Sequence, residues 1–436
     1  MKLCSCHSLL LLSFYLSLLN AAVFGLNNDG FTLLSLMRHW NSVPPYIASS
    51  WINGSDSSPC KWLGIECDTN HNVVSLNLST SAISGHLGPE IGHLRQLQTL
   101  DLSSNSFSGD IPQQLGNCTL LENLDLYSNG FTGEIPDSFK YLNNLQSLLL
   151  YDNLLNGEIP GSLFRIPGLE TVYLHNNSLS GSIPRNVCNL GQVVYLWLYS
   201  NKLSGTIPDS IGNCSKLQDL YLSFNDLVGH LPESLNNLEN LVYFVANNNN
   251  LEGQVTLGSG TIPSTFALLD MLSDLDLSEN RLSGEIPPEL GKCKSLTTLK
   301  LYTNQLEGQI PEPSELEDLE LFDNHLSGEI PISIWRIPSL KYLIVYTNNL
   351  SGELPLEMTE LKQLKNISLF NNQFSGDIPQ SLGINSSLVE LEFTNNKFTG
   401  EIPPNLCYGK KLRVLNMGFN QIHGHIPSDV VSCSTL

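Results

Sequence analysis

Residues 124–136 read LDLYSNGFTGEIP, and variants of this stretch recur along most of the chain. Each copy holds the segment L-x-L-x-x-N, whose last residue we call the anchor and number as position 0. Twelve of the fourteen intervals between anchors are 24 residues long, so the 436 residues reflect added short repeats rather than several globular domains. The fifteen anchors are Ser81, Asn105, Asn129, Asn153, Asn177, Asn201, Asn225, Asn249, Asn280, Asn304, Asn324, Asn348, Asn372, Asn396 and Asn420.

The repeat has the pattern of a leucine-rich repeat, with a short strand over L-x-L and a turn at the Asn. Side chains alternate along a strand, so the Leu residues at positions −5 and −3 point into the core. The anchor Asn is expected to be buried and to hydrogen-bond the backbone of neighbouring turns. The Gly-x-Ile-Pro that follows resembles the plant subclass of these repeats. We therefore expect a solenoid with one parallel sheet on the concave face of a twisted superhelix.

Two intervals break the period. From Asn249 to Asn280 the spacing is 31 residues, and residues 253–259 are interpreted as a partial repeat left by an internal loss, with a functional insertion loop as the alternative. From Asn304 to Asn324 the spacing is 20 residues. The repeat near 305–324 is therefore expected to be shortened on its convex side.

The two ends of the chain differ from the repeats. Residues 1–25 combine Lys2, an apolar run and small residues, which predicts a secretory signal peptide. Residues 26–70 hold a helix-like stretch and the pair Cys60 and Cys67, which are predicted to form a disulfide in an N-terminal cap. The repeats over 71–436 are expected to stop without a C-terminal cap, in a chain truncated before its last repeats.

Six further cysteines recur four or six residues after a repeat's Pro, which predicts small buried side chains rather than metal ligands. They are Cys118, Cys188, Cys214, Cys293, Cys407 and Cys433. Asn-x-Ser/Thr sequons fit an extracellular glycoprotein. N-glycosylation is expected at Asn53, Asn77, Asn117, Asn213, Asn349, Asn366 and Asn385. The sequon at Asn176 is expected to be empty or tilted to the rim, because a glycan there would crowd the concave face.

The chain is acidic, with 21 Lys and Arg against 42 Asp and Glu, a net charge of −21 and a pI near 4.7. Nucleic acids are bound by clustered Lys and Arg, so a nucleic-acid partner is excluded. No stretch after residue 25 reaches the roughly 20 apolar residues of a membrane span, and none is expected in this chain.

Position −2 is expected to face solvent on the concave side, and seven of its fifteen residues are aromatic where composition predicts about one. Large apolar side chains left in water mark interaction surfaces, so we predict a ligand-binding row. The alternative is that the rings stack on one another and stiffen the sheet. The predicted ligand-binding rings, including neighbours of the row, are Tyr127, Tyr151, His175, Trp197, Tyr199, Tyr221, Phe224, Tyr302, Phe322, Tyr346 and Phe370.

Acidic residues dominate positions −4, −2 and −1, where Lys300 is the only base. Asp323 and Glu392 are included in the predicted binding site. An acidic groove with aromatic rungs suits a basic, extended peptide. The alternative is that Leu-Asp-Leu-Ser is a common sequence in these repeats. It explains Asp101, Asp125 and Asp276 but not the other acidic residues.

Catalysis is not expected. The sequence holds no Gly-x-Ser-x-Gly elbow, His-Glu-x-x-His pair or glycine-rich phosphate loop, and its ten histidines are scattered. Carboxylates in open, solvated positions have no reason to change their pKa for acid–base work. We predict a binding protein without catalytic residues, metal or cofactor.

Several segments resemble plant leucine-rich-repeat receptor kinases that perceive endogenous elicitor peptides, the Pep receptors. These segments are LNNDG at 26–30, SLFRIP at 162–167, the run 345–376 and IPPNLCYGKKL at 402–412. The resemblance covers nearly all of residues 26–436. It implies a basic defence peptide on the concave face, a co-receptor kinase near the C-terminal repeats, and a membrane span and Ser/Thr kinase domain in a full-length relative.

The leading hypothesis is therefore a secreted, peptide-binding ectodomain of a plant defence receptor, truncated and unable to signal. The alternative is a stand-alone leucine-rich-repeat protein that inhibits a pathogen's cell-wall-degrading enzyme. A contact patch on the convex side or an edge would favour the inhibitor, whereas the aromatic row on the concave face favours the receptor.

Overall fold

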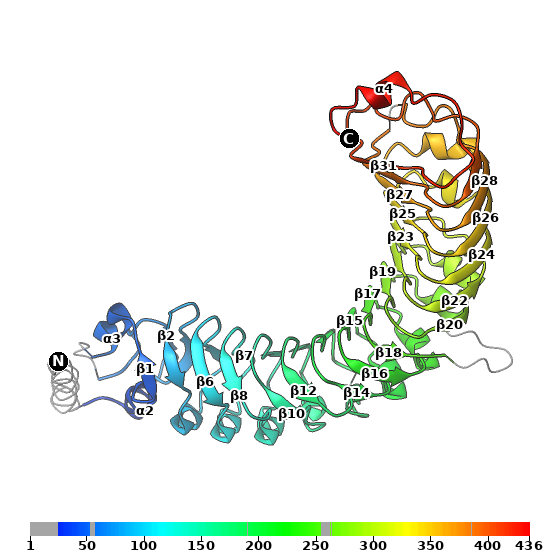
Figure 1. The fold of residues 1–436 in the computed structure, drawn as a ribbon. Coiled ribbons are helices and arrows are strands. Elements are labelled where there is room, and N and C mark those ends of the chain that lie inside the picture. Colours follow the sequence, from blue (N-terminus) through cyan, green and yellow to red (C-terminus); the bar gives the residue numbers. More distant parts are fainter. Residues whose placement is uncertain (1–24, 53–56, 190, 254–261, 263, 385) are drawn as a thin grey trace, which may run out of the picture. The chain divides into compact units, whose positions relative to one another are not determined.

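The computed structural model describes residues 25–436, except 53–56, 190, 254–261, 263 and 385 and the side chains of residues 265 and 267 (Figure 1). The expected signal peptide at 1–25 and the expected partial repeat at 253–259 thus lie almost wholly outside the described residues. The chain divides into two compact units, one up to Asn186 and one from Val187. We call them unit 1 and unit 2 and describe each by itself.

Unit 1 begins with a helical cap. Its helices are α2 (Asn28–Met37) and α3 (Pro45–Ile52). The side chain of Asn27 caps α2 by accepting a hydrogen bond of 2.9 Å from the N–H of Gly30. Helix α2 lies against η1 (Pro89–His93), a 3-10 helix of the first repeat. The cap therefore covers the first repeat's apolar layer.

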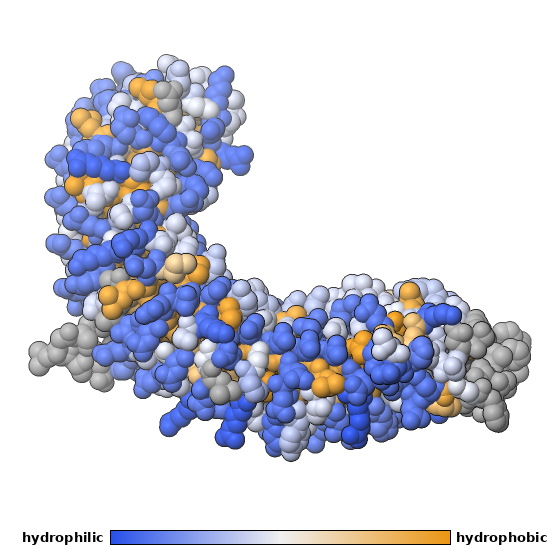
Figure 2. All heavy atoms as spheres, turned by 180° about the vertical axis from the view of Figure 1, so that it is seen from behind, coloured by the Kyte–Doolittle hydropathy of each residue, from blue (hydrophilic) through white to orange (hydrophobic). Residues whose placement is uncertain are grey.

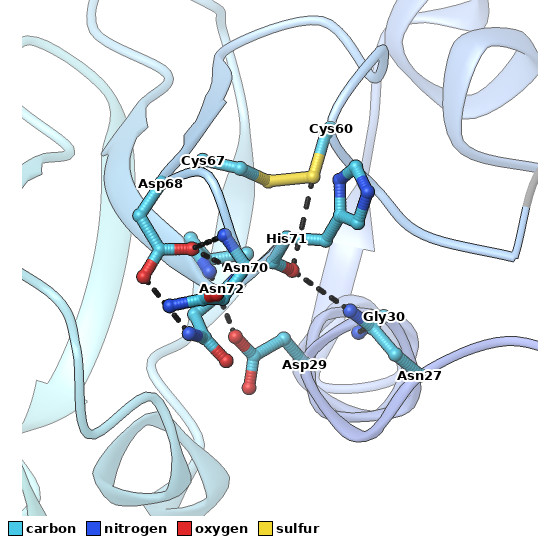
Figure 3. Close-up of a disulfide and its surroundings, with 10 residues drawn as sticks. Asn27, Asp29, Gly30, Cys60, Cys67, Asp68, Asn70, His71 and Asn72 are labelled. Carbon is cyan, nitrogen blue, oxygen red and sulfur yellow. Dashed lines mark hydrogen bonds between the residues drawn. A yellow bond between two sulfur atoms is a disulfide. The ribbon is translucent and has the colours of Figure 1, made fainter.

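A disulfide joins Cys60 to Cys67 in this cap, with the Cα atoms 5.5 Å apart (Figure 3). Cys67 ends β2 (Ile65–Cys67), which pairs antiparallel with the first repeat strand. The turn that follows is held by Asp68, whose carboxylate accepts hydrogen bonds of 2.9 Å from the backbone and side chain of Asn72. The disulfide thus lies beside the strand that joins the cap to the repeats.

A sheet that we call the main sheet has one strand for every anchor, and each repeat strand ends at position −4. Successive repeat strands within each unit are parallel. In unit 1 they are β3 (Val73–Asn77), β5 (Thr99–Asp101), β7 (Asn123–Asp125), β9 (Ser147–Leu149) and β11 (Thr171–Tyr173). In unit 2 they are β13 (Tyr195–Trp197), β15 (Asp219–Tyr221), β17 (Tyr243–Val245), β19 (Asp274–Asp276), β21 (Thr298–Lys300), β23 (Asp318–Glu320), β25 (Tyr342–Ile344), β27 (Asn366–Ser368), β29 (Glu390–Glu392) and β31 (Val414–Asn416).

The core lies behind the main sheet and is built as expected from positions −5 and −3. Leu124 and Leu126, which hold these positions before Asn129, are both fully buried. Each buried leucine contributes about 1.5–3 kcal/mol. Because every repeat adds a similar layer, the fold gains stability by repetition rather than from one central core.

The anchor amides connect successive turns, which confirms the expected role of the Asn. The Nδ2 group of Asn153 donates to the carbonyls of Leu126, in the preceding repeat, and Leu150, at 3.0 and 3.1 Å. Its Oδ1 accepts from the N–H of Phe131 at 3.0 Å. A buried amide that uses both ends in this way avoids the cost of unsatisfied polar groups.

Smaller parallel sheets and 3-10 helices complete each turn. In unit 1 the sheets contain β1 (Trp40–Ser42, antiparallel to β4), β4 (Ser84–His86), β6 (Ser106–Asp110) and β8 (Gly130–Thr132), and β10 (Asn156–Glu158) with β12 (Ser178–Ser180). In unit 2 they contain β14 (Ser204–Gly205), β16 (Asp226–Gly229) and β18 (Asn250–Leu251), and β20 (Ser283–Glu285), β22 (Gln305–Gly308), β24 (His325–Glu329), β26 (Asn349–Glu353), β28 (Gln373–Asp377) and β30 (Lys397–Thr399). The helices after η1 are η2 (Gln113–Asn117), η3 (Asp137–Tyr141), η4 (Leu163–Arg165), η5 (Asp209–Asn213), η6 (Glu233–Asn237), η7 (Ser264–Leu268), η8 (Pro288–Lys292), η9 (Ile334–Arg336), η10 (Leu356–Glu360) and α4 (Ser428–Val431).

The glycine after each anchor leaves room for a side chain of the preceding repeat. Gly133 has a φ of +73°, and a Cβ on it would lie 2.5 Å from Oδ1 of Asp110. Both the left-handed backbone and this close approach require glycine. In the shortened repeat, residues 309–317 contain no helix, so the four missing residues fall where other repeats form a 3-10 turn.

The six cysteines expected as small buried side chains include four that are disulfide-bonded, which the sequence interpretation did not foresee. Disulfides join Cys188 to Cys214 and Cys407 to Cys433, each at a separation of 26 residues, whereas Cys118 and Cys293 are free and buried. A cysteine four residues after one repeat's Pro reaches a cysteine six residues after the next Pro. Cys118 and Cys293 have no such partner in the preceding repeat, where the corresponding residues are glycine and alanine.

Candidate functional site

In unit 1 the predicted rings form a continuous stack on the main sheet. The rings of Tyr127 and Tyr151 are 4.5 Å apart and nearly parallel, at 4°, and Tyr151 and His175 are 4.4 Å apart at 13°. His175 is 4% exposed, and this burial lowers its pKa to about 4 although the nearby carboxylate of Asp152 acts in the opposite direction. The imidazole is therefore neutral at neutral pH and acts as a third ring of the stack.

In unit 2 the rings of four successive repeats form a second stack, which we call the four-ring stack. Its members are Tyr302, Phe322, Tyr346 and Phe370, with centroid distances of 4.3, 4.4 and 4.2 Å and interplanar angles of 7–15°. Stacked pairs of this kind contribute about 0.5–1.5 kcal/mol each. The four-ring stack therefore adds stability across repeat boundaries.

Stacking changes the expected chemistry of the row. The sequence predicted rings exposed to solvent, but the structure leaves every member of the two stacks half-buried or buried, as the stacking alternative predicted. Phe322 and Tyr346 are covered on both faces by their neighbours. A cation binds over a ring face. The inner rings therefore present only their edges to a ligand, and Tyr346 its hydroxyl.

A third aromatic group in unit 2 has a different geometry. Trp197, Tyr199, Tyr221 and Tyr243, which we call the tilted cluster, have centroids 5.1–6.3 Å apart, and Trp197 and Tyr221 are inclined by 59°. Tyr243 is 37% exposed. It lies at position −6 and was not among the predicted site residues. Positions −6, −4 and −2 lie on the same face of a strand, so an aromatic row extended to position −6 would have included Tyr243.

Position −1 has an unusual backbone throughout. The φ angle at this position lies between +50° and +56° in all fifteen repeats. Ser, Thr, Asn and Asp occupy most of these sites, but Phe224 is an aromatic residue and is 54% exposed. A bulky side chain in left-handed backbone is strained. Asp323 has the same geometry and is exposed, so both predicted residues project from turns at the border of the main sheet.

Asp101 and Asp276 of the main sheet each accept a hydrogen bond from a serine two residues further along the chain. Ser103 donates to Asp101, and both oxygens lie 2.6 Å apart. Asp125 has Tyr127 instead of a serine, and its Oδ1 is buried without a hydrogen-bond partner among the described residues. Burial and the neighbouring Asp101 raise the pKa of Asp125 to about 6.

Lys300, the one base found in the sequence at positions −4, −2 and −1, is not available to a ligand. Its Nζ lies 2.7 Å from Glu320 and 3.1 Å from Asp318. Burial opposes the charge, but the hydrogen bonds and charges of these two carboxylates raise the pKa of Lys300 above its ordinary value. Glu392 accepts hydrogen bonds from Ser368 and Asn416, at 3.0 and 3.2 Å, and forms no ion pair with a base among the described residues.

The glycosylation sequons fall into two groups. Asn77, Asn117, Asn213 and Asn349 are exposed, whereas Asn53 and Asn385 lie outside the described residues. Asn366 is half-buried in β27, where its Nδ2 donates to Glu390 over 2.7 Å. Asn176 is exposed and donates to Asp152 over 2.7 Å. A glycan on Asn366 or Asn176 would have to displace a hydrogen bond to a carboxylate.

Other kinds of site are poorly represented. Within the described ranges, no three His, Cys, Asp or Glu side chains are grouped so that they could hold a metal ion. None of the helices in the described part of the chain has the length and hydrophobicity that a bilayer crossing requires. On the face drawn in Figure 2, hydrophilic residues predominate and hydrophobic ones occur in small separate groups.

Family models match both the cap and the repeats. The Leucine rich repeat N-terminal domain matches residues 26–68. The Leucine Rich Repeat matches residues 96–118, 120–142, 168–190, 192–214, 216–238, 271–293, 363–384, 387–408 and 411–433. Together these matches cover more than half of the chain.

Two plant kinases match shorter stretches. A receptor-like protein kinase of Ipomoea nil is 58% identical over 77 residues, which are 18% of this chain and 7% of that protein. The leucine-rich repeat receptor-like protein kinase PEPR1 of Arabidopsis thaliana is 52% identical over 91 residues, which are 21% of this chain and 8% of that protein. The matched segments thus span less than a tenth of these relatives' length.

A solved structure matches almost the whole chain. The crystal structure of PEPR1–AtPEP1 has 51% sequence identity and a TM-score of 0.72, and the match covers 94% of this chain and 64% of that one. These matches agree with the architecture described above, in which every anchor has a strand of the main sheet. The chain belongs to the leucine-rich-repeat family and resembles the plant receptor kinase PEPR1.

Proposed function

We propose that the chain is an extracellular, ligand-binding ectodomain that recognises a basic endogenous elicitor peptide in plant defence signalling. The observation that carries this proposal is the 51% identity over 94% of the chain to the structure of PEPR1–AtPEP1. The proposal makes the main sheet a binding surface rather than a catalytic one.

The face of the main sheet supports a peptide ligand. Aromatic side chains occupy it in both units, and extended ligands are recognised by a few buried or half-buried rings of this kind. The carboxylates of Asp125, Asp323 and Glu392 lie beside the rings and have no basic partner among the described residues. Acidic side chains of this kind attract and orient a basic peptide.

The proposal also assigns the parts of the chain. Residues 1–25 are proposed as a secretory signal, 26–70 as the cap and 71–436 as the repeats, with the sequons as glycosylation sites. Disulfides such as Cys60–Cys67 are typical of secreted proteins and support this location. By resemblance, a co-receptor kinase is proposed as a second partner of a full-length form. Because the matched relatives are receptor kinases, the alternative of an enzyme inhibitor is not favoured.

Titration calorimetry of the secreted chain with synthetic AtPEP1 tests the proposal. We expect saturable binding that weakens when every Lys and Arg of the peptide is replaced by Gln. Glu392→Gln together with Asp323→Asn should weaken binding of the basic peptide and leave the weak binding of the neutral peptide unchanged. Absence of binding to AtPEP1 and to a library of basic extended peptides would overturn the proposal.

A further inference from the structure

Tyr243 is flanked by a carboxylate on each side. In the main sheet it pairs in register with Asp219 of β15 and with Asp274 of β19. Neighbouring strands lie about 4.8 Å apart, so both carboxylates and the ring project from the same face within one side chain's reach. Asp219 is flanked in turn by Tyr195 on its other side. Rings and carboxylates therefore alternate along position −6.

These carboxylates have no base to neutralise them. Among the described residues no lysine or arginine forms an ion pair with Asp219 or Asp274, and Lys300, on the strand after Asp274, is held by Asp318 and Glu320. Burial raises the pKa of Asp219, although a hydrogen bond from Trp197 opposes the rise. Burial and the charges of Asp219 and Asp274 together raise the pKa of Tyr221 to about 12. Both carboxylates thus act on the tilted cluster.

The tilted cluster offers a planar cation more room than the inner rings of the four-ring stack do. The rings of Trp197, Tyr199 and Tyr221 are inclined by 47–60° with centroids 5.1–6.3 Å apart, and Tyr243 lies at 26° to Tyr221 with a centroid distance of 6.3 Å. The inner rings of the four-ring stack are covered at 4.2–4.4 Å. Tyr243, at the edge of the cluster, is also exposed to solvent. A guanidinium group stacks on such a ring and can bond carboxylates at its edge.

The hydroxyl of Ser223, in the same repeat as Asp219, is buried without a hydrogen-bond partner among the described residues. Ser223 follows Asp219 and Tyr221 at position −2 and is only 4% exposed. The equivalent Ser278 donates to the carboxylate at its position −4, which in the repeat of Ser223 is replaced by Tyr221. A polar group enclosed in this way is normally satisfied. Ser223 lies four residues after Asp219, about 13 Å along an extended chain, so its unpaired hydroxyl is a local consequence of Tyr221 and lies outside the reach of a cation at position −6.

We propose that Asp219, Tyr243 and Asp274 form the seat of one arginine side chain of the bound peptide. This inference rests on the proposed function, which it deepens by fixing where a positive charge of the ligand binds. The ring of Tyr243 supports the guanidinium plane, and the two carboxylates accept its N–H groups. Trp197 and Tyr221 form the apolar wall beside it.

The test uses a small probe instead of a peptide. The five tryptophans of the full chain are labelled as 5-fluorotryptophan, and the signal of Trp197 is assigned with Trp197→Phe. N-acetylarginine methylamide is titrated in and followed by fluorine NMR, with the neutral citrulline analogue and the lysine analogue as further arms. We expect a saturable shift of the Trp197 signal with arginine, a smaller one with lysine and none with citrulline.

Variants locate the seat. Asp219→Asn with Asp274→Asn should weaken binding of the arginine probe by about tenfold or more. Tyr243→Phe should retain it and Tyr243→Leu should lose it. Glu390→Gln is the matched control, because Glu390 also lies at position −6 and is half-buried, but it bonds Asn366 and has no tyrosine on either neighbouring strand. Glu390→Gln should bind as the parent chain does.

The outcomes separate this inference from the proposed function. A shift that is equal for citrulline, unaffected by the two Asn substitutions or absent at Trp197 overturns the seat. If AtPEP1 binds with the same affinity to the parent and to the double Asn variant, the seat is wrong and the peptide-binding function stands. If the probe binds as expected but no basic peptide does, an arginine-binding site remains at these residues, while the proposed function and the assignment of the site to its peptide both fall.

Discussion

The hydroxyl of Ser278 donates a hydrogen bond of 2.6 Å to Oδ1 of Asp276. Position −2 thus supplies the partner of position −4, and this pairing fails wherever a tyrosine replaces one member. Asp125 and Ser223 are the members left over, each with a buried oxygen that has no partner among the described residues. Leaving a polar group unpaired costs about 1–3 kcal/mol. The missing partner therefore costs stability at Asp125 and Ser223, which at Asp125 opposes the gain from the stacking of Tyr127 on Tyr151.

Asp125→Asn is expected to remove a pH dependence of stability. Burial and Asp101 raise the pKa of Asp125 from 3.8 to about 6. Between these values the native chain holds a proton that the unfolded chain has lost, so the carboxyl destabilises the fold increasingly as the pH rises from about 4 to 7. The urea midpoint of the parent should therefore fall relative to that of Asp125→Asn over this range. The exposed Asp226→Asn should follow the parent, and a constant parent-to-variant difference would contradict the assignment.

His175→Phe is expected to have the opposite effect on the acid side. Burial lowers the pKa of His175 from 6.5 to about 4. Below pH 6.5 this histidine is protonated in the unfolded chain, but in the native chain it is protonated only below about pH 4. The histidine therefore reduces stability as the pH falls from about 6.5 to 4. Phenylalanine keeps a ring on Tyr151 and removes the titration. Urea midpoints measured from pH 7 to 4 should decline less steeply for the variant, and parallel curves would refute the prediction.

Position in the four-ring stack should decide the cost of losing a ring. Phe322 stacks on a ring on each side, whereas Phe370 stacks on one ring, that of Tyr346, among the residues that the structure describes. At about 0.5–1.5 kcal/mol per stacked pair, Phe322→Ala should lose about 1–3 kcal/mol from stacking and Phe370→Ala about half as much. Urea unfolding of the two variants makes the comparison, with Phe322→Tyr as the control that preserves the stack. Equal losses for the two alanines would show that stacking is not what stabilises this row.

The cysteine pattern should be visible in a mass spectrum. Of the eight cysteines that the structure describes, only Cys118 and Cys293 should be alkylated when the chain is denatured without reductant. Replacing Cys188 and Cys214 by serine opens a loop of 26 residues and should cost about 3–4 kcal/mol. Cys118→Ala, which removes a buried thiol but no cross-link, is the control. Alkylation of Cys188 before reduction would show that this bridge is absent.

The sequence determines the repeating part of the fold because the same local problem is solved in each turn. The leucines before Asn129 and the amide of Asn153 could be placed from spacing alone, since alternation along a strand and the need to satisfy a buried amide leave one arrangement. The aromatic row was found for the same reason. A period of 24 residues brings equivalent positions into register on neighbouring strands.

What could not be predicted depends on contacts between two repeats. Whether Tyr346 shows a face or an edge is set by the side-chain torsions of its neighbours, which the repeat pattern does not contain. The pairing of Cys188 with Cys214 requires a cysteine at two different places in successive turns, whereas the recurrence of each place alone suggested only small buried side chains. Tyr243 was missed because the row was read at position −2, although position −6 lies on the same face.

The spacing of the rings in the four-ring stack differs from the spacing of residues in an extended peptide. Three intervals of 4.2–4.4 Å separate Tyr302 from Phe370, about 13 Å in all, whereas an extended peptide advances about 3.3 Å per residue and covers that distance in four residues. The spacing of the rings and the spacing of peptide residues coincide only after three ring intervals, which equal four residues. A peptide that crosses these strands cannot give each residue an equivalent ring. Under the proposed function, only side chains four residues apart in such a peptide would meet equivalent rings of this stack.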